Sequence, residues 1–479
     1  MQRKIYIILI LAIVISLFAA ITSFAANTEI SSSANAITNI ISSEGGEHVL
    51  PETYMVIPFI VLLLMIATGP IFYQHFWERH YPKVAFVLVI ITVIFYVGML
   101  DDTLSLIHSL KEYISFIALL GSLFVAAGGI FVKVDRKATP FVNVLFLLFG
   151  AVIANIIGTT GASMLLIRPY IKMNRNRIKP YHIIFFIFLV SNIGGALTPI
   201  GDPPLFIGFL RGVPFFWVIG NVWFIWLPVV ILILAVFYMF DFSNKGNTNI
   251  DNVEDEYSGK FEFKGMKNVG YLLIIIISVF LDPAVLSWVP SLDPLPFGIR
   301  EVIMFSVMYF SFKGSDQEIL KANEFDFEPI KEVAYLFIGI FITMVPALQL
   351  IAHEANVLSD KLNAGIFYWA TGGLSGFLDN TPTYLNFLSA AMGKYALDVN
   401  VKSEVLEFVS RDDIYLRAIS VAAVFFGSMT YIGNGPNFMV KSICERAGIE
   451  MPSFFTYMIK YSIPILIPIF IIVWAIFFR

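Results

Sequence analysis

Two apolar stretches that lie far apart in the chain are interrupted in the same way by glycine, proline and small polar residues. Ile200-Gly-Asp-Pro-Pro-Leu-Phe206 aligns with Ile432-Gly-Asn-Gly-Pro-Asn-Phe438. Each follows an earlier polar cluster, Asn155-Ile-Ile-Gly-Thr-Thr-Gly-Ala-Ser163 or Phe377-Leu-Asp-Asn-Thr-Pro-Thr383. Non-helical backbone within a membrane survives only where protein buries it or where it lines a wet cavity. Paired interruptions in the two halves of a chain indicate the substrate site of a secondary transporter.

The composition predicts a membrane protein. Of the 479 residues, 58% are hydrophobic and 14% are charged, whereas soluble domains carry about 25% charged residues. Several apolar runs reach the roughly 20 residues that a helix needs to cross a bilayer. The net charge of −4 provides no basic face for nucleic acid, and the single cysteine, Cys444, allows no internal disulfide. Motifs for phosphate binding or serine hydrolysis are absent from the sequence, so we expect no enzyme activity and no cofactor.

The distribution of lysine and arginine predicts how the segments are oriented. The loops that we place inside are 74–83, 133–140, 168–180, 241–267, 313–331 and 441–452. These loops carry 19 Lys and Arg, and the opposite loops carry 6, which agrees with the positive-inside rule. A hairpin at 141–167 then enters from the cytoplasm, and a hairpin at 364–392 enters from outside. We therefore expect an all-α polytopic membrane protein with two inverted-topology repeats, each with a re-entrant hairpin and a broken transmembrane helix.

These features divide the chain into regions. We expect a first membrane repeat at 53–240 with its broken helix at 181–210, and a second at 268–479 with its broken helix at 414–440. The cytoplasmic linker between them is 241–267. The basic start, apolar run and small residues of 1–26 predict a signal peptide, or alternatively an uncleaved first helix, before an extracytoplasmic segment at 27–52. We expect a multi-pass protein of a bacterial inner (plasma) membrane, with the lipid bilayer and inorganic cations as its partners and without nucleic acid.

Both interrupted regions carry oxygen-bearing groups that suit a dehydrated cation. A hard cation such as Na⁺ prefers carboxylate, hydroxyl, amide and carbonyl oxygens. The candidate ligands in the first half are Asn155, Thr159, Thr160, Ser163, Ser191, Asn192, Thr198, Gly201 and Asp202. Those in the second half are Asp379, Asn380, Thr381, Thr383, Ser428, Thr430, Asn434 and Asn437. A single hydroxyl can equally serve close packing of membrane helices, but two matching clusters at two breaks favour an ion site.

Asp202 and Asp379 are the two acidic residues within the interrupted regions. A carboxylate near the bilayer centre is costly and usually marks an ion or proton pathway. One carboxylate can hold either a proton or a sodium ion, and this competition is the simplest mechanism of antiport. Asp202 could instead serve a local turn, because Asp-Pro is a common turn pair. We predict Na⁺ binding at both residues, and we expect Asp379→Asn to abolish sodium-dependent proton movement.

The segment Ser191–Phe216, which includes Thr-Pro-Ile-Gly-Asp-Pro-Pro-Leu-Phe, closely resembles NhaD-type sodium/proton antiporters. Asn155–Arg168 is similar to the first hairpin of that family, and Asp379–Thr383 is similar to the second. The family belongs to the ion transporter superfamily, which also contains citrate, dicarboxylate and arsenite carriers. The resemblance implies a homodimer and an elevator-like movement of the hairpins and broken helices against a scaffold. Asn434 departs from the pattern, because it stands where the first half has an aspartate.

Three functions fit this sequence. The first is exchange of Na⁺, or Li⁺, for H⁺. The second is sodium-coupled symport of a carboxylate such as citrate or succinate, and the third is arsenite-type efflux. Asp202 and Asp379 add negative charge to the predicted centre, whereas Arg168 and Arg211 lie at predicted segment ends. This balance favours a cation as the transported species.

Overall fold

A computed structural model describes residues 50–134, 138–244, 261–283, 285–286, 288–292, 295–411 and 413–479. The expected signal peptide at 1–26 lies outside the described residues. So do nearly all of the expected extracytoplasmic segment at 27–52 and residues 245–260 of the expected linker.

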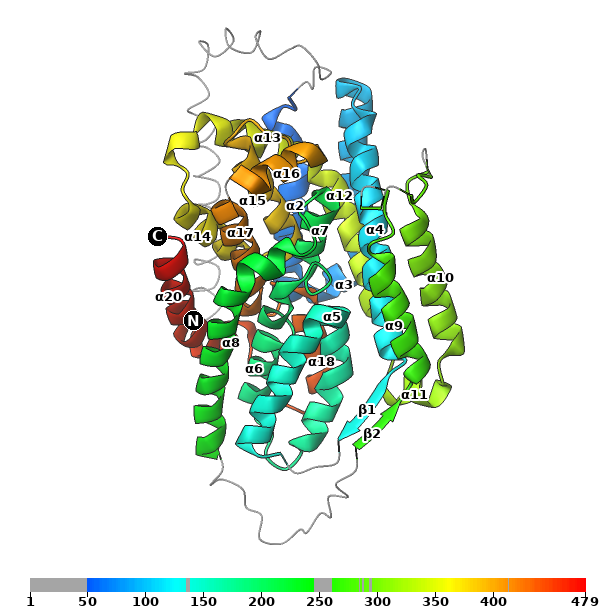
Figure 1. Ribbon diagram of the computed structural model, residues 1–479, viewed down its shortest axis with the longest axis vertical. Helices are drawn as coiled ribbons and strands as arrows, with labels where there is room; N and C mark the ends of the chain where they lie inside the picture. The colour runs from blue at the N-terminus through cyan, green and yellow to red at the C-terminus, as the bar shows by residue number, and fades with distance from the viewer. Residues whose placement is uncertain are drawn as a thin grey trace. The chain divides into compact units, whose positions relative to one another are not determined.

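Helices make up most of the described chain (Figure 1). The first half contains α2 (Ile57–Phe72), α3 (Gln74–Phe95), α4 (Thr103–Gly128), α5 (Pro140–Met173), α6 (Pro180–Leu189), α7 (Pro203–Arg211) and α8 (Trp217–Ser243), with the short helical turns η3 (Thr53–Val56), η4 (Tyr96–Leu100) and η5 (Ile193–Leu197). The second half contains α9 (Met266–Ser278), α10 (Ile299–Gly314), α11 (Gln317–Ala322), α12 (Glu328–Thr343), α13 (Val345–Val357), α14 (Ala364–Ser375), α15 (Asn380–Gly393), α16 (Lys402–Arg411), α17 (Asp413–Phe426), α18 (Gly435–Arg446), α19 (Phe454–Tyr457) and α20 (Ile467–Phe477), with the turns η7 (Ser359–Lys361), η8 (Gly427–Met429) and η9 (Met458–Leu466).

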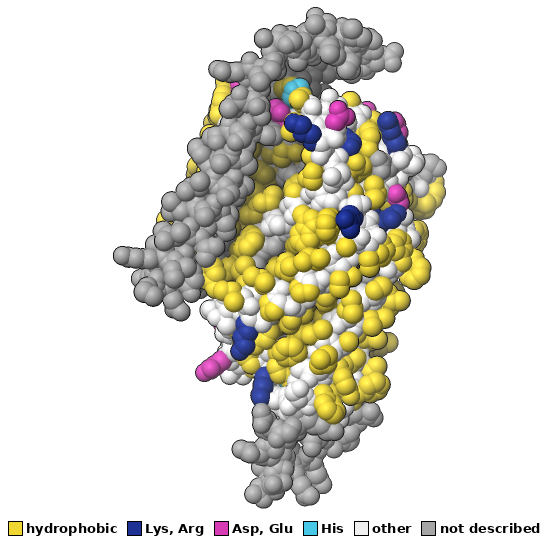
Figure 2. Space-filling view, turned by 90° about the vertical axis from the view of Figure 1, so that its left-hand side faces the viewer, with side chains coloured by type: hydrophobic (Ala, Val, Ile, Leu, Met, Phe, Trp, Pro, Cys, Tyr) yellow, Lys and Arg dark blue, Asp and Glu magenta, His cyan; other side chains and the backbone are white. Residues whose placement is uncertain are grey.

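The outer surfaces of the helices are those of a membrane protein. Among the described residues, six stretches are long and apolar enough to cross a membrane, and α12 and α13, bent by 45°, form a seventh if they count as one span. Val87, Ile90 and Ile94 of α3 are 55%, 55% and 60% exposed, and exposed apolar side chains of this kind suit contact with lipid. In Figure 2, hydrophobic side chains cover the middle of one face, and charged side chains gather mainly toward its two ends. The expected class, an all-α polytopic membrane protein, is confirmed.

A short β-ribbon is the one departure from helix in the described chain. Strand β1 (Phe131–Val134) pairs antiparallel with β2 (Phe261–Lys264), with Phe131 opposite Lys264. The sequence predicts loops at both places. The ribbon joins two segments that the distribution of lysine and arginine places on the same side of the membrane.

The segment expected as the first hairpin forms α5, which folds back on itself at Gly158. The backbone there has φ 78° and ψ 154°, a conformation that glycine adopts without the strain of a side chain. The two ends of α5 meet, because Asn143 Nδ2 donates to Asn174 Oδ1 at 2.8 Å and Asn174 Nδ2 donates to Asn143 Oδ1 at 2.9 Å. The 34 residues of α5 are therefore a re-entrant hairpin rather than one straight span.

The segment expected as the second hairpin forms α14 and α15. Its ends are also joined, because Lys394 Nζ donates to the carbonyl oxygen of Leu362 at 2.8 Å. The open ends of α5 lie toward the bottom of Figure 1, whereas α14 and α15 lie in the upper part. The two hairpins therefore approach the centre from opposite ends.

The two broken segments have the same internal construction. The first runs from α6 through η5 to α7, and the second runs from α17 through η8 to α18. Thr198 Oγ1 accepts from Gly201 N at 3.0 Å, and Thr430 Oγ1 accepts from Gly433 N at 3.1 Å. Most side chains of α6 and α17 are fully buried. Protein rather than lipid therefore surrounds the non-helical backbone of each break.

Close backbone approach inside the first break predicts that Gly201→Ala disrupts the fold. A Cβ at Gly201 would lie 2.1 Å from the carbonyl oxygen of Gly195. We expect a loss of about 1–3 kcal/mol of stability from this overpacking, measured as a lower melting temperature of the purified protein. Gly373→Ala is the matched control, because nothing lies within 4 Å of a Cβ at Gly373. Equal melting temperatures for the two variants would contradict the close approach.

Candidate functional site

Asp202 lies where both hairpins and both breaks meet. The residue precedes α7, but its side chain makes no capping hydrogen bond to that helix. Its Oδ1 accepts from Thr159 Oγ1 at 2.8 Å and from Asn434 Nδ2 at 2.9 Å. Its Oδ2 accepts from Asn380 Nδ2 at 2.6 Å. The carboxylate therefore joins the first break to the tips of both hairpins and to the second break.

The electrostatic setting of Asp202 is unusual for a buried carboxylate. Its exposure is 0%, and the three donors that contact it, Thr159, Asn380 and Asn434, are all neutral. A buried charge is normally paired with an opposite charge, because neutral hydrogen bonds replace its hydration only in part. The centre therefore favours a species that neutralises the carboxylate, either a proton or a cation.

A pair of asparagines links the two breaks beside Asp202. Asn192 Nδ2 donates to Ile187 O at 2.8 Å and to Asn437 Oδ1 at 2.6 Å. Asn437 Nδ2 donates in turn to Gly427 O at 2.8 Å and to Thr430 O at 2.9 Å. Because the amide nitrogens are committed to carbonyl acceptors, the oxygen and nitrogen of each side chain can be told apart.

This arrangement leaves one acceptor oxygen without a donor. Asn192 Oδ1 is buried and has no hydrogen-bond partner among the described residues. A Cβ at Gly427 would lie 3.1 Å from this oxygen and 3.5 Å from Asn380 Nδ2, so Asn192 Oδ1 and the amide that contacts Asp202 both lie beside Gly427. A buried acceptor without a donor costs about 1–3 kcal/mol, and a bound cation would recover that cost.

Most of the other predicted hydroxyls and amides hold the breaks against the hairpins. Thr198 Oγ1 donates to Asn155 O at 2.6 Å, and Thr430 Oγ1 donates to Gly376 O at 2.7 Å. Further contacts are Asn155 Nδ2 with Gly194 O at 2.6 Å, Thr159 N with Gly201 O at 2.8 Å, Ser163 Oγ with Ser191 Oγ at 2.8 Å, Ser191 O with Asn434 Nδ2 at 3.2 Å, Thr383 Oγ1 with Asp379 O at 3.0 Å, and Ser428 Oγ with Phe425 O. The backbone therefore engages several of the predicted ligands.

Three predicted residues lie outside this central set of contacts. Asp379 is partly exposed, and its Oδ1 accepts from Thr381 N at 2.9 Å as the N-cap of α15. Thr381 Oγ1 is 3.5 Å from Asn380 Oδ1. Thr160 lines a small pocket beside α4 that Gly158 and Gly201 also line.

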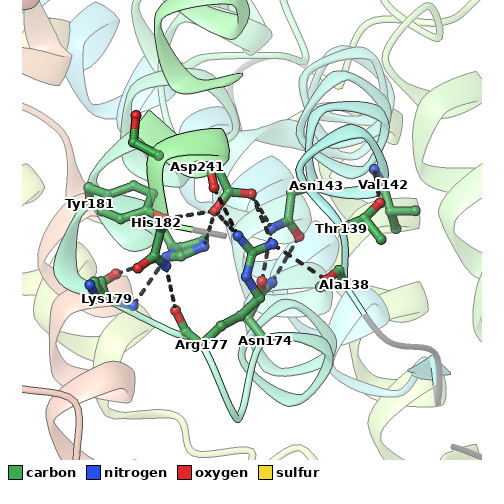
Figure 3. A network of polar contacts seen from close by, with 12 residues as sticks. Ala138, Thr139, Val142, Asn143, Asn174, Arg177, Lys179, Tyr181, His182 and Asp241 are labelled. Carbon is green, nitrogen blue, oxygen red and sulfur yellow. Dashed lines mark hydrogen bonds and ion pairs between the residues drawn. The ribbon is translucent and has the colours of Figure 1, made fainter. Parts of the chain in front are cut away.

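A buried ionic cluster that the sequence does not predict lies at the base of the first hairpin (Figure 3). Asp241 of α8 has 0% exposure and forms an ion pair with Arg177 at 2.7 Å. It also contacts Tyr181 Oη at 2.7 Å, His182 Nε2 at 3.0 Å and Asn143 Nδ2 at 2.9 Å. Asp241 follows an apolar run and Arg177 lies in a basic loop, so no local spacing pattern could have paired them.

Two re-entrant hairpins that meet two broken helices at a buried carboxylate define a membrane transport protein. A family model described as "Putative citrate transport" matches residues 48–478. This match covers most of the 479 residues, and the chain belongs to that family. None of the curated proteins matches the chain.

Proposed function

We propose that this protein exchanges Na⁺, or Li⁺, for H⁺ across the membrane, and that Asp202 holds the two cations in turn. The observation that carries the proposal is one fully buried carboxylate, contacted by neutral donors from both hairpins and the second break. An unloaded carboxylate is costly in this environment. Binding either H⁺ or Na⁺ neutralises it, so the loaded forms are the ones that cross the barrier.

Several oxygen atoms could serve as ligands of a sodium ion at the carboxylate. Asn192 Oδ1 is the acceptor without a donor, and Thr159 Oγ1 already contacts Asp202. Asn380 and Asn434 present their amide nitrogens to Asp202, and each carboxamide also carries an acceptor oxygen. Rotation of these amides would exchange donors for acceptors, so the same side chains can serve the protonated and the sodium-loaded carboxylate.

The test is proton flux in everted membrane vesicles that contain the protein, followed with a pH-sensitive dye after a respiratory proton gradient is formed. We expect addition of Na⁺ or Li⁺ to release protons from the vesicles, and we expect little response to K⁺ or to citrate. A response to citrate without a response to Na⁺ or Li⁺ would contradict cation exchange.

Sodium-coupled symport of a carboxylate is the second candidate, and the family description supports it. In that case Na⁺ would drive accumulation of labelled citrate or succinate in right-side-out vesicles. Arsenite-type efflux has no comparable support, and arsenite serves as a further arm of the same assay. These arms separate the three functions, because each follows a different transported species: protons, a labelled carboxylate or arsenite.

Substitution of Asp379 tests whether its charge or only its helix cap is needed. We expect both Asp379→Asn and Asp379→Ser to abolish sodium-dependent proton flux, because each removes the charge while keeping a side chain that can cap α15. Flux is measured in everted vesicles at matched protein levels. Normal flux in both variants would show that Asp379 acts only through its hydrogen bond to Thr381 N.

A further inference from the structure

A polar cavity of about 300 Å³ lies at the end of α7 that is remote from Asp202. It lies between α4, the C-terminal end of α7, the start of α10 and the start of α16. Its lining includes residues from four loops that the distribution of lysine and arginine places outside, 101–112, 211–216, 289–296 and 393–413. The cavity, called the outer cavity below, therefore belongs to the side of the membrane that the sequence predicts to be outer.

A second and much smaller cavity lies beside Asp202. Its volume is about 10 Å³, near the roughly 10–15 Å³ that one water molecule needs. Gly201 and Pro203, which flank Asp202 in the chain, line this small cavity together with Thr159. Thr159 Oγ1 donates to Asp202 Oδ1 at 2.8 Å. The small cavity is therefore next to the carboxylate that we propose to hold the cation.

The same two helices, α4 and α7, line both cavities, and they pack against each other. On α4, Ser115 lines the outer cavity and Leu119 lines the small one. On α7, Phe209 lines the outer cavity and Phe206 lines the small one. Four residues of helix rise by about 6 Å and three by about 4.5 Å. About one helical turn therefore separates the two cavities.

Aromatic side chains lie along that turn. Phe116 of α4 and Phe206 of α7 both line the small cavity, and they are 0% and 1% exposed. Phe116 stacks on Phe337 of α12 with ring centroids 4.6 Å apart, and Phe206 contacts the ring of Phe209 at 6.2 Å. Hydrophobic constrictions close a pathway by excluding water. Phe116 and Phe206 therefore form a barrier between the outer cavity and Asp202.

Polar contacts join α4 to α7 on the outer side of this barrier. Glu112 of α4 accepts through Oε2 from Nη2 of Arg211, the last residue of α7, at 2.7 Å. Arg211 also contacts the side chain of Asn400 and is 4% exposed. These contacts keep the outer end of α7 against α4, and with it the barrier residue Phe206.

We propose that the outer cavity is the entrance through which cations from the outer side reach Asp202, and that Phe206 is the gate that closes this path. Phe116 is held by its stacking on α12, whereas Phe206 lies on the short helix that begins directly after Asp202. A displacement of α7 relative to α4 would move the gate together with the carboxylate. The inference rests on Asp202 as the transport site, as proposed above, but not on which species that site carries.

The experiment measures how fast single cysteines react with a positively charged, membrane-impermeant methanethiosulfonate reagent. The reagent is added to right-side-out vesicles that contain the full-length protein, in which the single native cysteine, Cys444, is replaced by alanine. Leu123→Cys reports on the small cavity, because Leu123 lines it and is 2% exposed. Leu295→Cys reports on the outer cavity, where Leu295 is 46% exposed. Ser122→Cys is the matched control, because Ser122 is a fully buried neighbour on α4 outside the lining of both cavities.

We expect fast labelling of Leu295→Cys and slow labelling of Leu123→Cys. Adding Phe206→Ala should raise the labelling rate of Leu123→Cys roughly tenfold or more, because loss of the constriction admits water and the reagent. The rates of Ser122→Cys and Leu295→Cys should not change. Phe188→Ala removes another fully buried ring that lines neither cavity, and it should leave Leu123→Cys slow.

Three results would overturn the proposal. The first is an unchanged labelling rate of Leu123→Cys in Phe206→Ala protein that is shown to be folded by its melting temperature. The second is an equal increase with Phe188→Ala, which would indicate general loosening. The third is an increase found only in everted vesicles, which would place the entrance on the inner side. Phe206→Leu shortens the side chain without emptying its place, and the same comparisons apply to it if the alanine variant does not fold.

Failure of the gate and failure of cation exchange give different results. Labelling that depends on Phe206 in a protein without sodium-dependent proton flux would refute the exchange and leave the path intact. Sodium-dependent proton flux in a protein whose labelling does not depend on Phe206 would refute the gate alone.

Discussion

Asp202→Asn is expected to reduce sodium-dependent proton flux to that of vesicles without the protein, while the protein still inserts and folds. An amide can neither release a proton at neutral pH nor neutralise a bound cation. The hydrogen bonds can largely persist, because an amide oxygen can still accept from Thr159 and Asn434, and Asn380 can rotate to accept from the new amide. The measurement is dye-monitored proton flux in everted vesicles, with the melting temperature of the purified variant as the folding control.

Two companion variants make this test specific. Asp360→Asn removes an exposed aspartate of η7, and flux should stay at the wild-type level. The double variant Asp202→Asn with Asn434→Asp moves the carboxylate to the equivalent place in the second break. The Asn434 side chain contacts Asp202 directly, because its Nδ2 lies 2.9 Å from Asp202 Oδ1. We expect part of the flux to return in the double variant. Wild-type flux in Asp202→Asn alone would refute a cation-carrying role for this residue.

Arg177→Gln is expected to destabilise the folded protein by about 3–5 kcal/mol, the typical cost of leaving a buried charge without its partner. The side chain of Asp241 is 0% exposed and that of Arg177 is 9% exposed, so water cannot replace the lost contact. The ion pair also anchors both ends of α5, because Asn143 contacts Asp241 and Asn174. A lower melting temperature and a lower yield of folded protein in detergent would show this loss.

Two further variants test whether the loss of stability in Arg177→Gln comes from the broken ion pair or from the removal of any arginine. Arg175→Gln changes an exposed arginine of the same loop and should leave the melting temperature within the error of the wild type. Arg177→Gln combined with Asp241→Asn leaves no unpaired charge, so we expect the double variant to melt above the single one. If Arg177→Gln melts with the wild type, the ion pair does not stabilise the hairpin base.

The interrupted segments were readable from the sequence because their chemistry is local. Glycine at 158 permits a backbone turn that other residues resist, and Pro203 and Pro204 can begin a helix but cannot continue one. The structure forms α14 and α15 where the second hairpin was expected, and α17 and α18 around the second expected break. The bend between α12 and α13 was not expected, and it places Pro346 in the first turn of α13.

The partners of Asp202 could not be read from the sequence. Thr159, Asn380 and Asn434 lie 43, 178 and 232 positions away along the chain, and no local pattern states which of many polar side chains will meet. The same is true of Asp241 and Arg177, 64 positions apart. The side chain of Asp379, by contrast, contacts a near neighbour in the chain, because its Oδ1 accepts from Thr381 N.

By itself, the sequence determined that this chain crosses a membrane and where its two interrupted segments break, because hydrophobicity, glycine and proline act over a few neighbouring residues. Tertiary structure alone decided which carboxylate lies at the centre, which amides contact it, and which charges are paired at the base of the first hairpin. Those outcomes depend on the packing of helices that are distant in the chain, since a buried polar group is stable only beside the particular partners that packing brings to it.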